Sequence, residues 1–239
     1  MPPAARSPFY LWAAGGFLLV ILAGFFTTYL RPVWRGEFHG GAVFHVHGAL
    51  LLAWALLVTA QAWLVNRRNL PLHRSLGVLS LALVPSIVVS TVTVALVAMQ
   101  RDLPALGEVA VSSVLGSITS PLIFASLVAA ALVHRRRPEY HKRLMLLASV
   151  ALLWPAFFRL RHYFPSVPRP DLVFGVVASQ LVVVAAMAAD RLRHGRVHPV
   201  YLWVGIPFIA EAFAETLLFD SAGWRVVARA VVGLFVELP

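Results

Sequence analysis

The sequence predicts an all-α fold, a polytopic transmembrane helix bundle of about seven helices in one domain spanning residues 1–239. Of the 239 residues, 60% are hydrophobic and only 13% are charged, and the mean hydropathy is +0.81. A soluble domain is about half apolar and a quarter charged. The apolar residues also gather in long runs, each near the ~20 residues that a helix needs to cross ~30 Å of hydrocarbon. These observations exclude a water-soluble globule, a disordered chain and a fibrous repeat.

Seven apolar runs follow one another along the chain, and a shorter apolar segment ends it. The runs lie at roughly 9–30, 45–65, 76–99, 109–133, 143–160, 172–189 and 200–219. They lack the alternating pattern of barrel strands, so each is predicted to be a helix. The last segment, 224–239, is short for a span and contains Arg225 and Arg229. We therefore expect it to form an interfacial or re-entrant helix.

The distribution of basic residues predicts the orientation. The net charge is +10, and every basic residue is an arginine except Lys142. Twelve of the 20 basic residues fall on one predicted side, at Arg6, Arg67, Arg68, Arg74, Arg135, Arg136, Arg137, Lys142, Arg143, Arg191, Arg193 and Arg196. This bias predicts a cytoplasmic N-terminus, with anionic lipid as the partner of the cytoplasmic loops and no nucleic-acid partner.

Several chemistries are excluded by missing residues. The chain has no cysteine, which excludes disulfides, iron–sulfur clusters, thiolate zinc sites and covalently attached c-type haem. A retinal Schiff base needs an intramembrane lysine, and Lys142 falls in a predicted loop. Phosphate-binding and dinucleotide-binding glycine motifs are also missing, as are the GxSxG and HExxH motifs. No motif assigns a catalytic residue, so the sequence leaves open whether the protein is an enzyme.

Intramembrane polar residues are the candidates for function, because a charge at the bilayer centre costs about 2.5–3.5 kcal/mol. His47, Trp54 and Gln61 are spaced by seven and therefore share one helix stripe, which we expect to face the bundle. The stripe is either a packing seam or a polar seam that holds a ligand, haem or a proton path.

Two later runs carry further candidates. His141 and His162 lie about 30 Å apart on one helix and cannot share a metal ion. Glu211 and Glu215 are four residues apart and share a helix face. They form either a structural pair or a proton or cation site. From its depth, Arg159 is the expected partner of Glu215.

The histidines are predicted to gather at the two faces of the membrane. One group contains His39, His45, His47 and His162, and the other contains His73, His141, His198, His134 and His194. His73, His141 and His198 each precede or open a predicted helix. There the helix dipole disfavours the imidazolium form and leaves the ring free to bind iron, copper or zinc. The alternative is that these histidines bind no metal and simply lie at the membrane interface among lipid headgroups.

Residues 44–205 resemble a widespread group of bacterial multi-pass membrane proteins with no assigned reaction. The resemblance rests on HG-x5-W-x6-Q at His47, Trp54 and Gln61, on HRxLG at His73, on HKRLM at His141, and on Arg159. It implies a multi-pass protein of the cell inner membrane. A weaker likeness to b-type membrane cytochromes rests on histidines at helix ends. It implies haem b held by the depth-matched pairs His73 with His141 and His47 with His162.

Three functions therefore remain as hypotheses at the sequence level. The first is a haem- or metal-binding redox or assembly protein that uses the four paired histidines. The second is a small proton-coupled transporter that uses Glu211, Glu215 and Arg159. The third is a structural accessory subunit in which every polar residue serves packing. The sequence names no protein partner.

Overall fold

The computed structural model describes residues 9–237, and within that range every regular element is a helix. The elements are α1 Phe9–Phe25, η1 Phe26–Leu30, α2 Arg31–Trp34, α3 Ala42–Asn66, α4 Leu70–Gly77, α5 Ser80–Leu106, α6 Glu108–Val133, α7 Pro138–Ala151, α8 Trp154–Phe158, η2 Arg159–His162, η3 Asp171–Ala178, α9 Ser179–His194, η4 Tyr201–Gly205, α10 Ile206–Leu218 and α11 Ala222–Val232. The predicted all-α class is confirmed.

Six rods of the described chain are long and apolar enough to cross a membrane. They are Phe9–Trp34, Ala42–Asn66, Leu70–Leu106, Glu108–Val133, Asp171–His194 and Tyr201–Leu218. A seventh span results if Pro138–Ala151 and Trp154–His162 are counted together across their 42° bend. Pro155 has no N–H to donate to the carbonyl of Ala151, which is a sufficient cause for this break. A multi-pass membrane protein is therefore the architecture that the structure supports.

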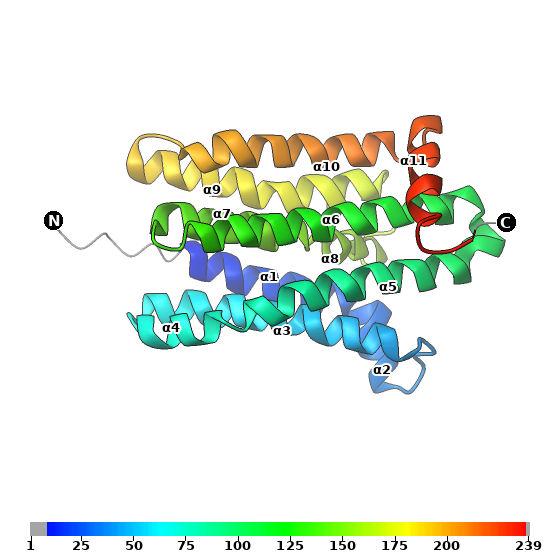
Figure 1. The fold of residues 1–239 in the computed structure, drawn as a ribbon, viewed down its shortest axis with the longest axis horizontal. Helices are drawn as coiled ribbons and strands as arrows, with labels where there is room; N and C mark the ends of the chain where they lie inside the picture. Colours follow the sequence, from blue (N-terminus) through cyan, green and yellow to red (C-terminus); the bar gives the residue numbers. More distant parts are fainter. Residues whose placement is uncertain (1–8, 238–239) are drawn as a thin grey trace.

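The spans lie side by side, and α7 is the most enclosed helix (Figure 1). Its Leu147 is fully buried in one core cluster with Phe124 of α6 and Val183 of α9. At the other end of this region α1 approaches α8 closely, at Gly24. A Cβ there would lie 2.9 Å from the carbonyl carbon of Ala156, so this approach depends on glycine.

Helix α11 lies across one end of the bundle rather than along it (Figure 1). Its buried residues Ala228 and Val232 pack with Val111 and Val114 of α6, and Val226 on its other side is exposed. The helix is therefore amphipathic. The interfacial position within a membrane stays a prediction.

Three loops that are rich in arginine lie together at the end of the bundle opposite α11 (Figure 1). We call this the basic end and define it by the α3–α4, α6–α7 and α9–η4 connections. Arg6, which was counted with these loops, lies outside the described residues. The cytoplasmic orientation of this end and the inner-membrane location stay predictions.

Candidate functional site at the basic end

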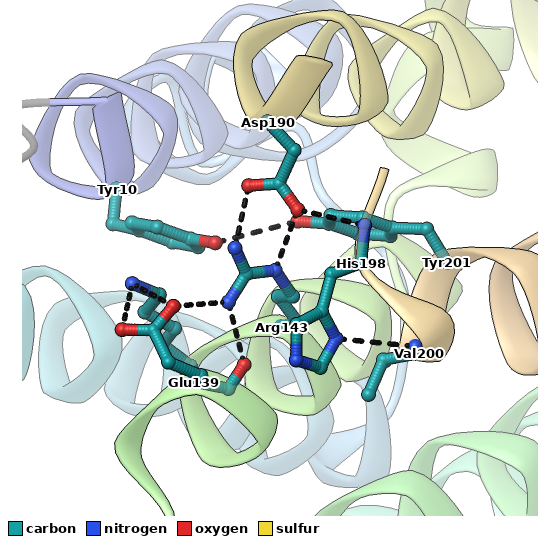
Figure 2. Close-up of polar contacts among 8 residues, drawn as sticks. Tyr10, Glu139, Arg143, Asp190, His198, Val200 and Tyr201 are labelled. Carbon is teal, nitrogen blue, oxygen red and sulfur yellow. Dashed lines mark hydrogen bonds and ion pairs between the residues drawn. The ribbon is translucent and has the colours of Figure 1, made fainter. Parts of the chain in front are cut away.

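A buried ion pair joins α7 to α9 at the basic end (Figure 2). The guanidinium of Arg143 donates from Nε to Oδ2 of Asp190 at 2.8 Å and from Nη2 to Oδ1 at 2.6 Å. Its Nη1 donates to the backbone carbonyl of Glu139 at 2.7 Å and to Oε2 of Glu139 at 2.6 Å. The side chains of Arg143 and Asp190 are 1% and 8% exposed. Four of the five guanidinium protons thus have partners.

Helical spacing turns both charged groups inward. Arg143 shares a buried stripe of α7 with Leu147 and Val150, at steps of four and three residues. Asp190 shares a buried stripe of α9 with Val183 and Ala186, again at steps of three and four. The two stripes face the same core, so the charges meet where the helices pack. A bidentate pair of this kind holds α7 and α9 in one register.

Aromatic side chains surround this ion pair. The ring of Tyr201, which is fully buried, lies 5.8 Å from the Arg143 guanidinium carbon, and its hydroxyl lies 3.5 Å from that of Tyr10. His198 donates its backbone N–H to Oδ2 of Asp190 at 3.3 Å, and its Nδ1 accepts the backbone N–H of Val200 at 3.2 Å. Burial, followed by the charge of Arg143, lowers the pKa of His198. The imidazole is therefore neutral near pH 7, with its proton on Nε2.

A hollow of about 420 Å³ opens beside the pair. Its lining residues are Glu139, Arg143, Asp190, His194, Arg196 and His198. Helix α9 ends at this hollow because Gly195 adopts φ +70°, a left-handed conformation that favours glycine. The reversal brings the α9–η4 loop back over α7.

A second polar cluster at the same end contains three predicted residues. The rings of His73 on α4 and His141 on α7 meet edge to face, with centroids 6.4 Å apart. His141 is held by a 2.9 Å bond from Nδ1 to the carbonyl of Ala131, and Gln61 of α3 donates to the carbonyl of His73 at 3.0 Å. Nδ1 of His73 and Oε1 of Gln61 are buried without a hydrogen-bond partner. The structure therefore brings together the predicted pair His73 and His141.

The other predicted pair is not brought together. His47 bonds through Nδ1 to the hydroxyl of Ser90 at 3.1 Å, whereas His162 lies exposed in η2. Within residues 9–237 no contact between these two rings is recorded, and no three His, Cys, Asp or Glu side chains converge on a metal position. Trp54 is buried and packs edge to face on Phe124 at 4.8 Å, as its inward stripe predicts.

The expected pairing of Arg159 with Glu215 is wrong. Arg159 donates to the hydroxyl of Thr28 at 3.2 Å and to the carbonyl of Pro155 at 2.8 Å, and it lies over the ring of Phe25. Glu215 accepts instead from the hydroxyl of Thr119 at 3.1 Å and interacts with Glu211 on its own helix. Depth alone could not decide the pairing, because η2 turns Arg159 toward the end of α1 and away from α10.

Sequence reasoning missed Asp190, the counter-charge of Arg143. Arg143 was counted among the loop cations, although it lies one turn inside α7. The available signal was the position of Asp190 directly after the apolar run 172–189, on the same stripe as Val183 and Ala186. An acidic side chain on a buried stripe needs a partner.

Comparison of the chain with protein-family models, with curated proteins and with solved structures finds no match. The family resemblance and the haem expectation therefore stay predictions, and the function must be argued from the geometry.

Proposed function

We propose that this multi-pass membrane protein binds a transition-metal ion between His73 and His141, in a redox or metal-assembly role. The observation that supports the proposal is the unpartnered, buried Nδ1 of His73, next to a histidine whose ring is already oriented. A buried imidazole nitrogen without a hydrogen bond is costly unless something binds it.

The hydrogen bonds select the nitrogens that would bind the ion. A backbone carbonyl only accepts, so Nδ1 of His141 carries the proton that it gives to Ala131. Nε2 of the neutral ring then holds a free lone pair, in the arrangement typical of metal-ligating histidines. Gln61 holds the backbone carbonyl of His73 through its amide nitrogen, and its Oε1 is buried without a hydrogen-bond partner. Two imidazoles favour zinc, copper, iron or nickel.

The surroundings of the pair, more than the distance between its rings, favour a small ion over haem. Two metal–nitrogen bonds of about 2.0–2.1 Å place the ring centroids about 5–6.5 Å apart, depending on the angle between the bonds, and the observed separation is 6.4 Å. Haem iron would fit the same two bonds, but a porphyrin also needs a planar slot. The 420 Å³ hollow at this end is lined by other residues and includes neither His73 nor His141.

Metal titration of the purified chain tests this proposal. Protein in mild detergent is stripped with a chelator and titrated with Zn²⁺ and Cu²⁺, and bound metal is measured by elemental analysis. We expect one ion per chain, at least 10-fold weaker binding in His73→Ala and His141→Ala, and unchanged binding in the control His194→Ala, which alters an exposed histidine of the same end. Equal binding in all four proteins would refute the proposal. A Soret absorption band in the purified protein would identify the ligand as haem and not as a single metal ion.

A second candidate function is proton-coupled transport through Glu211 and Glu215. Both lie on one face of α10 inside a predicted span, and Glu215 bonds to a neutral partner, Thr119. Two neighbouring carboxyl groups without a cation hold a proton more readily than two charges. In liposomes with a pH-sensitive dye, a proton flux that Glu211→Gln abolishes and the exposed control Glu37→Gln keeps would favour this function.

A further inference from the structure

The hollow beside Arg143 and Asp190 has the size and position of a ligand site. Its volume of about 420 Å³ falls within the ~300–1,000 Å³ typical of small-molecule sites. It is formed by the first two turns of α7, the last two turns of α9 and the loop that leads into η4. A single inorganic ion would leave most of this space unfilled.

The charges within its wall balance one another. Arg143 is bonded to Asp190 and Glu139, and Glu139 also pairs with Lys142 at 2.8 Å. Two cations thus compensate two carboxylates, and this group presents no net charge to the hollow. Its carboxylates therefore do not decide which ligand charge is favoured.

The remaining lining residues all offer hydrogen-bond donors or positive charge. His198 directs its Nδ1 lone pair to the Val200 N–H, so its donor is Nε2–H. Arg196 and His194 are exposed, and no hydrogen bond or ion pair of their side chains is recorded within residues 9–237. An arginine beside imidazole donors matches the oxygens of a phosphate group.

The depth of the hollow fits a lipid phosphate. The apolar span on one side ends at His194 and the next begins at Tyr201, so the hollow lies at the boundary of the hydrocarbon region, where headgroups are found. We propose that it binds a phosphate-bearing headgroup, with Arg196, His194 and His198 as the phosphate ligands. The Arg143–Asp190 ion pair, whose charges cancel, would line the bottom of the hollow. This inference is independent of the proposed metal site.

Binding measurements on purified protein in mild detergent test the inference. Short-chain phosphatidylglycerol, glycerol 3-phosphate and the phosphate-free short-chain diacylglycerol are compared by their effect on the melting temperature. The variants are Arg196→Ala and His198→Phe. The matched control is Arg136→Ala, an exposed arginine of the same end that does not line the hollow.

We expect saturable stabilisation by phosphatidylglycerol, none by diacylglycerol, and an apparent affinity at least fivefold weaker in Arg196→Ala and His198→Phe but not in Arg136→Ala. Equal affinity for glycerol 3-phosphate would support the phosphate site and assign it to a soluble ligand. Stabilisation by diacylglycerol alone, or an equal loss in Arg196→Ala and Arg136→Ala, would overturn the proposal. If His198→Phe fails to fold, Arg196→Ala against Arg136→Ala still decides the outcome.

Discussion

Removing one partner of the Arg143–Asp190 pair should destabilise the bundle far more than removing both. In Asp190→Leu the Arg143 guanidinium loses two of its four hydrogen bonds while its side chain stays 1% exposed. In Arg143→Met the Asp190 carboxylate keeps, among residues 9–237, one hydrogen bond, from the backbone N–H of His198. Breaking a buried pair on one side costs about 3–5 kcal/mol, whereas replacing both partners by apolar residues is often neutral or stabilising.

The assay is SDS titration of the purified protein in mixed micelles, followed by circular dichroism. We expect each single variant to lose about 3–5 kcal/mol, and the double variant Arg143→Met with Asp190→Leu to recover most of that loss. The exposed pair Arg101–Asp102 provides the control, and Asp102→Asn should change stability by no more than ~1 kcal/mol. Additive losses in the double variant would refute the argument that the two charges compensate each other.

Three further predictions concern other parts of the molecule. Gly24→Ala places a Cβ 2.9 Å from the carbonyl carbon of Ala156, and we expect a loss of about 1–3 kcal/mol in the same SDS titration. Because the pKa of His198 is lowered below 6.5, the unfolded chain takes up this proton first as the pH falls. The melting temperature should therefore drop between pH 7.5 and 5.5, and by less in His198→Asn. Trp224→Phe removes the 3.0 Å bond from its indole Nε1 to α6, and amide hydrogen exchange in α11 should become faster, by a factor that corresponds to about 1 kcal/mol.

The spans could be predicted from sequence because their physical requirement is local. The transfer free energy of an apolar run depends only on its own residues. Six of the seven predicted runs fall within the rods or the bent pair, and the seventh, 200–219, extends one residue beyond Tyr201–Leu218 at each end. The inward stripe of α3 was predictable for the same reason. Helical periodicity predicts that this stripe faces the bundle, and Trp54 is buried in the core. Gln61, on the same stripe, donates a hydrogen bond to a backbone carbonyl. The internal Pro155 of the fifth run predicts a kink in its helix, and the structure bends by 42° between Ala151 and Trp154.

The pairing of charges could not be predicted, because it depends on helix packing. Asp190 meets Arg143 across 47 positions of sequence, and no local pattern links an acidic residue of α9 to a basic residue of α7. The assignment of Arg159 to Glu215 failed for the same reason. The position of a residue along its helix predicts its depth in the membrane. The direction in which its side chain points depends on how the neighbouring helices pack.

The unpaired buried polar atoms include one on the proposed metal site. In the described chain, five buried side-chain atoms have no hydrogen-bond partner, on Thr27, Trp54, Gln61, His73 and Gln180. Those of Thr27, Trp54 and Gln180 lie far from one another along the chain. Gln61 and His73 are directly bonded to each other, and His73 contacts a second, oriented imidazole. The fold satisfies the Arg143 guanidinium with four bonds but leaves Nδ1 of His73 without a partner, and a metal ion bound there would supply one.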